Sequence, residues 1–475
     1  MTDRANRFSR ERRQVIAASL AAIIGSPALA GSQPLSVFRP EDFGAIGDGR
    51  ADDTAAFGQM SRAVSQAGGG TIVLSKRTYM VGKQRRAQPP LYGFEPQPII
   101  DLEGLRLGVT IEGGGAVLKA NPGGLYGSFD VSGTPLRRAM PFFDAGALAS
   151  PYRFMIRVAH SHGPVVIRNL ELNGNLGAMR IGGEWGDTGW QIPMTGIALV
   201  DNRGGEVLSD LYLHDHGQDG LLIDGPAGTM RSPLVIERVR CIRNGRQGCS
   251  IVGGSGYRFV DCEFSQTGRG PVFSAPGAGV DIEAEGGKRV ERLTFERCVF
   301  DDNYGAGMVA DSGPSSDVSF NACRFVGTSN WSVWPSKPKF RFQHCSFAGA
   351  VVRAFASTDP KVATQFVDCV FTDTDPATGR RVYGGDGAVP MVDLGGSYQA
   401  GLNVSFVRCK FDFRLGGKLP WTAGSIFESV LMSQASEEPA YPRGVYRGHS
   451  VIRGPAVLAS TRVEGSVILN GRQVR

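Results

Sequence analysis

Four carboxylates lie at equivalent places in a stretch that recurs along the middle of the chain. Each copy begins with glycine, and four residues of an extended strand follow it. The copies are Gly196–Val200, Gly220–Asp224, Gly248–Val252, Gly279–Glu283 and Gly307–Asp311. Because alternate side chains of a strand point to opposite faces, the second and fourth residues after each glycine share one outward face. That face carries Asp224, Asp281, Glu283 and Asp311.

The spacing of these carboxylates suits acid/base chemistry. Asp281 and Glu283 are about 6.6–6.8 Å apart along one strand, and adjacent strands place Asp311 about 4.8 Å from Glu283 and Asp224 about 9.6 Å from it. Like charges at such distances raise one pKa, which creates a general acid. The pairs cover the separations of retaining (about 5–5.5 Å) and inverting (about 6.5–9.5 Å) glycosidases, so the stereochemical outcome stays open. Glu283 is central and is the first candidate, although exposed carboxylates often serve only to solvate a surface.

Clustered carboxylate oxygens also suit calcium. That ion would fit a lyase, in which the metal neutralises a uronate while a basic residue removes the C5 proton. The available bases are Arg246, Arg269, Lys337 and Lys339, and their spacing favours none of them. We therefore expect no cofactor for hydrolysis, and calcium only for elimination.

A histidine-containing turn directly precedes the strand of Asp224. His214, His216 and Asp219 lie in this turn, in a chain that has only 6 histidines. The two histidines suit a substrate-facing acid/base pair, and the alternative is that they are ordinary turn residues bonded to the backbone. No third ligand accompanies them, so we predict substrate contact here and not a metal site.

Tryptophans accompany the same face. Trp185 and Trp190 lie in the longest insertion of the repeat region, and counting along the repeats places Trp334 in the outward column of Asp281. Exposed indole rings suit stacking on sugar rings. We expect these three residues to bind substrate, although one or two of the tryptophans could instead be packed inward.

A second repeat sets the register of these strands. The phrase Phe-x-x-Cys-x-Phe occurs six times, from Phe259–Phe264 to Phe406–Phe411, with successive copies as little as 22 residues apart. Repeats of this kind indicate one structural unit stacked many times. Seven of the 8 cysteines fall in the strong or weaker copies. In-register strands place equivalent residues about 4.8 Å apart, farther than the ~3.8 Å that disulfide Cβ atoms prefer, so we expect a buried, reduced column.

Two insertions fall on one turn of the repeat. The glycine usually follows the middle of the preceding phrase by nine residues, but by 17 after Cys262 and by 26 after Leu170. Both insertions precede the same strand of the unit. Loops lengthened at one corner of a solenoid commonly wall a binding cleft, which we expect beside the carboxylates.

The start of the repeat region is distinctive. Asp42-Phe-Gly-Ala-Ile-Gly-Asp-Gly-Arg-Ala-Asp-Asp-Thr54 precedes a predicted amphipathic helix, capped by Asp52, Asp53 or Thr54, and Gly68-Gly-Gly-Thr71 ends it. This segment resembles the N-terminus of pectate-lyase-superfamily (glycosidase-like) β-helix proteins, closely over residues 38–82 and loosely to about 410. The resemblance implies an all-β, right-handed single-stranded parallel β-helix with a capping helix, and a polysaccharide substrate. The Gly-His-Gly and Arg-Ile-Lys of polygalacturonase-like hydrolases and the Asp-Pro-His-Glu of alginate C5-epimerases are missing, so no catalytic residue is transferred.

The ends and the charge complete the organisation. Residues 1–30 resemble a bacterial twin-arginine export signal, with Arg12-Arg13 before an apolar run, which predicts a periplasmic or secreted protein. We expect a cap over 31–100, the β-helix over 101–415 and, over 416–475, a C-terminal cap or a contact that forms an oligomer. The net charge of +6 comes without a basic run interleaved with aromatics, which argues against nucleic acid. No later stretch is apolar enough to span a membrane.

These features predict an exported enzyme that cleaves a polysaccharide by acid/base glycoside hydrolysis on one face of a β-helix. Two alternatives remain open. One is a lyase that acts on a uronic-acid polymer, and the other is a non-catalytic carbohydrate-binding or surface-assembly β-helix.

Overall fold

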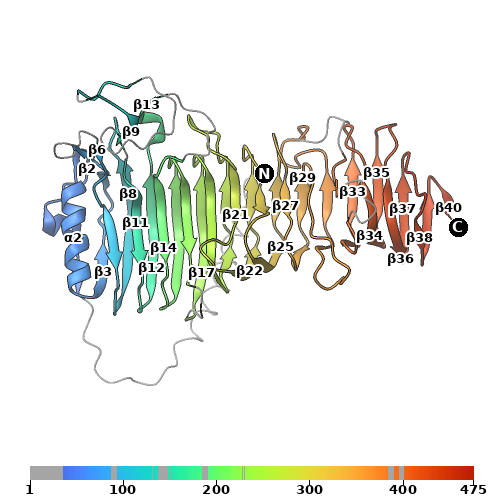
Figure 1. The fold of residues 1–475 in the computed structure, drawn as a ribbon, viewed down its shortest axis with the longest axis horizontal. Helices are drawn as coiled ribbons and strands as arrows, with labels where there is room; N and C mark the ends of the chain where they lie inside the picture. The colour runs from blue at the N-terminus through green and yellow to red at the C-terminus, as the bar shows by residue number, and fades with distance from the viewer. Residues whose placement is uncertain are drawn as a thin grey trace, which may run out of the picture. The chain divides into compact units, whose positions relative to one another are not determined.

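The computed structural model describes residues 36–86, 94–130, 132–136, 148–149, 151–183, 191–226, 228, 231–382, 390–394 and 401–474. Over these residues the chain is a right-handed parallel β-helix with one α-helix, α2 (Thr54–Gln66). Successive strands stack in parallel from the N-terminal to the C-terminal part of the chain (Figure 1). The predicted fold class is therefore confirmed.

The glycine-led stretches form one parallel sheet, which we call the glycine-led sheet. Its strands are β7 (Ile100–Glu103), β11 (Phe154–Ala159), β14 (Thr195–Val200), β16 (Asp219–Asp224), β18 (Gln247–Ser255), β21 (Ala278–Ile282), β24 (Met308–Ala310) and β27 (Val333–Pro335). Asp281 pairs with Val309, and Val309 pairs with Trp334. The register predicted from counting along the repeats is thus confirmed for this column.

The phenylalanine and cysteine side chains of the repeated phrases form the core of the β-helix, and the chain bends within each phrase. The phrases begin in β12 (Val165–Asn173), β15 (Glu206–His214) and β17 (Leu234–Ile242), and continue as pairs of short strands such as β22 (Val290–Glu296) and β23 (Val299–Asp301). Between the two strands of that pair, Arg297 has a φ of 53°, the left-handed conformation that turns the corner.

Stacked rings and thiols fill this core. Phe320 lies between two phenylalanine rings of adjacent rungs, at centroid distances of 4.7 and 4.8 Å. The Cys323 thiol donates to the carbonyl oxygen of Phe295 at 3.4 Å. All eight cysteines are buried and free, as the strand spacing predicts.

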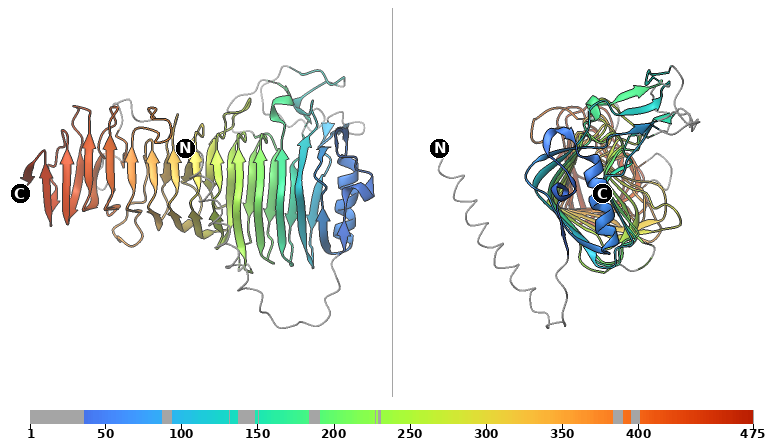
Figure 2. Two further views of the ribbon diagram at one scale, coloured as in Figure 1. Left: turned by 180° about the vertical axis from the view of Figure 1, so that it is seen from behind. Right: turned by 90° about the vertical axis from the view of Figure 1, so that its left-hand side faces the viewer.

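Helix α2 covers the N-terminal end of the stack, which Figure 2 shows end-on. Phe57, Met60 and Val64 are fully buried, in agreement with the predicted apolar face. Asp53 occupies the N-cap position, but its side chain makes no capping bond. It accepts instead from the backbone N–H groups of Ile46 (2.7 Å) and Gly47 (3.1 Å), so this carboxylate folds the preceding loop.

A small second sheet lies beside the first rungs (Figure 1). It contains β5 (Arg85–Arg86), β6 (Phe94–Glu95), β9 (Leu125–Ser128), β10 (Leu148–Ala149) and β13 (Arg180–Gly182). Strand β13 belongs to the longest insertion, between β12 and β14. The shorter insertion leads into β21 and is anchored where the N–H of Ser274 donates to the carbonyl of Gly245 at 2.9 Å.

The parallel stack continues to β39 (Ser466–Leu469), and β40 (Arg472–Val474) turns back antiparallel to it. Within the described part of the chain, no helix has the length and apolar character needed to cross a membrane. The predicted export signal of residues 1–30 lies outside the described residues.

Candidate active site

The candidate site is built around Arg246, in the turn before β18. Its Nη1 atom is 3.9 Å from Asp219 Oδ2 and donates to Gln247 Oε1 at 2.9 Å. Its Nη2 atom is 4.0 Å from Glu283 Oε2. Gln247 Nε2 in turn donates to Asp281 Oδ2 in a short hydrogen bond. We call these five residues the Arg246 cluster.

Consecutive strands of the glycine-led sheet bring the cluster together. Asp219 and Gln247 are the first residues of β16 and β18 and pair directly. Asp281 lies within β21. Glu283 follows that strand and stays in the ladder, because its N–H donates to the carbonyl of Ile251 at 3.1 Å. The turn after β24 adds Ser312, whose hydroxyl donates to Glu283 Oε1 at 2.7 Å.

Burial raises the pKa of two of these carboxyls, Asp281 and Asp219. Asp281 is only 4% exposed, and burial, with a smaller contribution from the charge of Glu283, raises its pKa to about 8. Burial raises the pKa of Asp219 to about 7, although the Arg246 guanidinium opposes the rise. Glu283 keeps a side chain that is 30% exposed. Near neutral pH the cluster therefore holds one buried carboxyl that is mainly protonated, Asp281, and a second buried carboxyl that titrates there, Asp219, beside the more accessible Glu283.

The orientation of the Gln247 amide is fixed by its partners. A guanidinium can only donate, so the amide oxygen must face Arg246. The amide NH₂ group must then face Asp281, where it donates a hydrogen bond to Oδ2. The proton of the Asp281 carboxyl is consequently assigned to Oδ1.

The other two predicted carboxylates, Asp224 and Asp311, lie outside the Arg246 cluster. Asp311 is exposed after β24, and its charge contributes to the raised pKa of Asp281. Asp224 Oδ1 accepts from Lys288 Nζ at 2.5 Å, and the same ammonium contacts Asp201 at 2.9 Å. A bulge after Ile223 also shifts the pairing of Asp224. The expectation that Asp224 acts with Glu283 has no support in this geometry, because Asp224 is held by an ion pair.

The predicted histidine pair separates into two different environments. His214 Nδ1 is 2.6 Å from Asp215, its Nε2 is 3.2 Å from Glu171, and its ring stacks on Tyr212 at 4.1 Å. The His216 ring is fully buried, its Nδ1 is hydrogen-bonded to the Tyr152 hydroxyl at 2.8 Å, and burial lowers its pKa to about 3. A substrate-facing His216 is therefore wrong, since the ring does not reach the surface. Of the residues predicted in this turn, Asp219 joins the Arg246 cluster.

An aromatic pair stands two strands beyond Asp281. Trp334 packs against Val309, and Trp331 meets it edge to face at 4.4 Å. The Arg353 guanidinium lies 5.3 Å from the Trp334 ring. Trp334 is thus beside the carboxylates, as predicted, whereas Trp185 and Trp190 lie outside the described residues.

Gln247 was not predicted from the sequence, and Arg246 was considered only as a base. The sequence does carry a signal for both residues, because Arg246-Gln247 and Gln218-Asp219 occupy equivalent places before the glycine of successive strands. In the described ranges, no group of three or more His, Cys, Asp or Glu side chains is arranged to hold a metal ion.

Comparison with known proteins agrees with the architecture. The family model "Right handed beta helix region" matches residues 156–349, and the chain has the right-handed parallel β-helix fold. No curated protein matches the sequence.

Similar solved structures include the A-module of the Azotobacter vinelandii mannuronan C-5 epimerase AlgE4, at 14% identity and a TM-score of 0.44, over 90% of this chain and 97% of that one. The Agl-KA catalytic domain matches at 13% identity and a TM-score of 0.44, over 94% and 70% of the two chains. The tailspike protein gp49 of Acinetobacter baumannii bacteriophage Fri1, a capsular polysaccharide depolymerase, matches at 12% identity and a TM-score of 0.40, over 89% and 63%.

Proposed function

We propose that this chain is an exported enzyme that cleaves a polysaccharide by acid/base hydrolysis at the Arg246 cluster. One observation carries the proposal: Asp281, buried and protonated near neutral pH, lies in β21, and the partly exposed Glu283 follows two residues later, directly after the end of that strand. Two carboxyls in different environments are what glycoside hydrolysis requires.

In this mechanism Asp281 is the general acid. Its Oδ1 proton passes to the glycosidic oxygen as the bond from that oxygen to the anomeric carbon breaks. Glu283 then either accepts a proton from the water that attacks this carbon or bonds to the carbon itself before water releases the sugar. Arg246 and Ser312 orient Glu283, and Asp219 lies on the other side of the guanidinium.

The outward face of the glycine-led sheet supplies the binding surface. Trp334 lies in the column of Asp281 and offers an aromatic ring to a sugar unit. Asp311, exposed next to Glu283, contacts the same polymer in this proposal. The segment after β6, which contains Pro96 and Pro98, borders this face near the first rungs.

Elimination of a uronic-acid polymer is the second candidate. It is favoured by the place of Arg246, which lies among the carboxylates where it would pair with a uronate. A guanidinium stays protonated in proteins, so elimination requires another base, and calcium would accompany this route.

The test is digestion of a panel of purified neutral and acidic polysaccharides by the full chain. New reducing ends without absorbance at 235 nm indicate hydrolysis, and an unsaturated product absorbing at 235 nm indicates elimination. We expect Asp281→Asn and Glu283→Gln each to lose about 10²- to 10⁴-fold in rate. Asp317→Asn, an exposed substitution beside Arg341, is the matched control and should keep wild-type activity.

Full activity in both variants would show that the site is misplaced. If the wild type binds a polymer without cleaving any of the panel, the chain is a carbohydrate-binding β-helix.

A further inference from the structure

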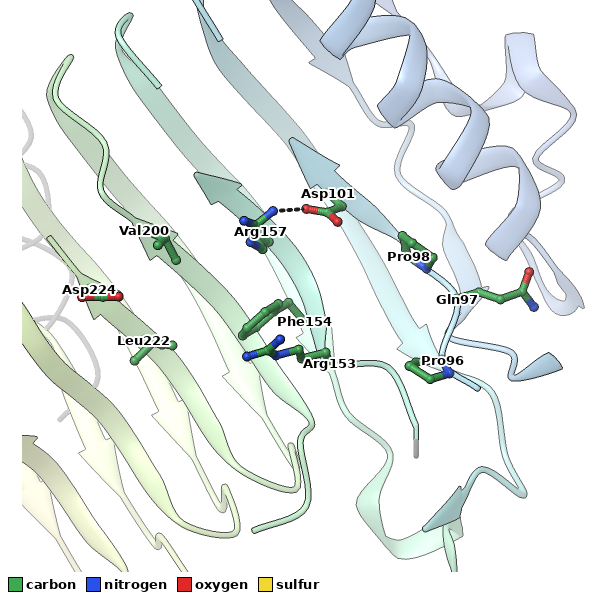
Figure 3. A pocket seen from close by; sticks show the side chains of 10 residues that line it. All are labelled: Pro96, Gln97, Pro98, Asp101, Arg153, Phe154, Arg157, Val200, Leu222 and Asp224. Atoms are coloured by element: carbon green, nitrogen blue, oxygen red, sulfur yellow. Dashed lines mark hydrogen bonds and ion pairs between the residues drawn. The ribbon is translucent and has the colours of Figure 1, made fainter. Parts of the chain in front are cut away.

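A pocket of about 400 Å³ opens on the glycine-led sheet over β7, β11, β14 and β16, on the N-terminal side of the Arg246 cluster. Figure 3 shows Phe154 at its centre, with Arg153 beside the ring and Arg157 above it. The loop that contains Pro96 and Pro98 forms one wall. The pocket shares no lining residue with the Arg246 cluster.

The floor of the pocket is apolar and its rim is polar. Phe154, Val200 and Leu222 are half-buried and supply an aromatic ring and two aliphatic side chains. Gln97 and four ionisable side chains provide hydrogen-bonding groups around them. An apolar floor can pack against the C–H face of a sugar ring, and a polar rim can form hydrogen bonds with the hydroxyl groups of the sugar.

Three of the four ionisable groups in the lining are already paired. Arg157 Nη1 is 2.7 Å from Asp101 and 2.9 Å from Glu103. Asp224 is bound to Lys288 at 2.5 Å. These three charged side chains are therefore already paired with other side chains of the protein.

Arg153 is the exception. Its guanidinium lies 5.1 Å from the centre of the Phe154 ring, and it forms neither a hydrogen bond nor an ion pair with the residues that the structure describes. The ring orients the guanidinium, and none of the described residues accepts its N–H groups. A planar fork of free donors matches the paired oxygens of a carboxylate or a sulfate.

We propose that this pocket binds an acidic sugar unit of the polysaccharide, with the ring on Phe154 and the anionic group on Arg153. The inference rests on the proposed function, because it assigns a substrate class to the same binding face. From β11 to β21 the sheet takes four strand steps, about 19 Å, so one polysaccharide chain of several units can occupy the pocket and the cluster together.

Binding without turnover tests the proposal. The probes are hexamers of galacturonate, mannuronate and glucuronate, each beside the same hexamer after reduction of its carboxyl groups, and a sulfated neutral hexamer. Calorimetry is done on the full chain carrying Asp281→Asn, with and without Arg153→Gln. At least one acidic hexamer should bind 10- to 100-fold tighter than its neutral counterpart, and Arg153→Gln should remove that preference.

The control is Arg341→Gln, on a different sheet and paired with Asp317, which should change nothing. Preference for a uronate hexamer identifies a carboxylate ligand, and preference for the sulfated hexamer identifies a sulfate ester. Equal binding of charged and neutral hexamers, or a preference that survives Arg153→Gln, overturns the inference while leaving hydrolysis intact. Wild-type protein that neither binds nor cleaves any polymer would instead refute the proposed function.

Discussion

The proton on Asp281 makes the stability of the fold depend on pH in a way that can be measured without a substrate. Burial raises the pKa of this carboxyl from 3.8 to about 8. The folded chain then holds the proton more tightly than the unfolded chain does. The contribution of Asp281 to the stability of the fold is therefore greatest below pH 4, and it falls as the pH rises from about 4 to about 8.

The size of the effect follows from the two pKa values. Between pH 5 and pH 8, this one group should cost the fold about 4 kcal/mol. Asp281→Asn cannot ionise, so the variant should lack this loss. At pH 8 the variant should be more stable than the wild type, although we expect it to be the less active protein.

The assay is urea unfolding at pH 5 and pH 8, followed by circular dichroism and by tryptophan fluorescence. The latter is useful because Trp331 and Trp334 lie two strands from Asp281. The control Asp317→Asn changes a side chain that is 46% exposed, and it should keep the wild-type pH dependence of the free energy of unfolding. If Asp281→Asn also keeps that dependence, the carboxyl ionises normally in the fold, and its role as a general acid is refuted.

Substitutions at three further positions test the site, the core and an ion pair. Gln247→Glu places a second carboxylate beside Asp281, which should raise the pKa of the acid and move the alkaline limb of the pH–rate profile upward, whereas Gln247→Ala should lower kcat about 10-fold or more by releasing the acid. Phe320→Ala, in the middle of the ring stack, should cost about 3–5 kcal/mol in unfolding experiments. Lys288→Met should destabilise the fold by about 1 kcal/mol, and a double-mutant cycle with Asp224→Asn should show that most of this loss comes from their pair.

The strand register could be predicted because two independent repeats in the sequence specify it. The Phe-x-x-Cys-x-Phe phrases and the glycine-led stretches repeat independently, and each restricts which residues pair. A slip of one residue would turn the core phenylalanines outward. That constraint is why Trp334 could be assigned to the column of Asp281 by counting, and why the cysteines could be predicted to be buried and free.

The partners of the polar side chains could not be predicted in the same way. Lys288 reaches Asp224 from a turn 64 residues later, and no repeat fixes the direction of a long side chain in a turn. At the bulge between Ile223 and Asp224 the partner strand β18 has one extra residue, Val252, which the alternation does not reveal. His216 turns inward because Tyr152 offers a buried hydroxyl, a contact between distant segments of the chain.

The Arg246 cluster occupies three adjacent strands of a long regular face, β16, β18 and β21. In the column just before the glycines, Asp219 and Gln247 are followed by Ala278. In the column two residues beyond the glycines, Ala198 and Leu222 are followed by Ser250 and then by Asp281. Polar residues therefore pass from the first column to the second at β18, which carries both Gln247 and Ser250. Gln247 can bridge to Asp281 because Ala278, next to it in its own column, is too small to cover the gap. A large residue in place of Ala278 would block this bridge without changing a single carboxylate, so the site depends on a small apolar residue as much as on its acids.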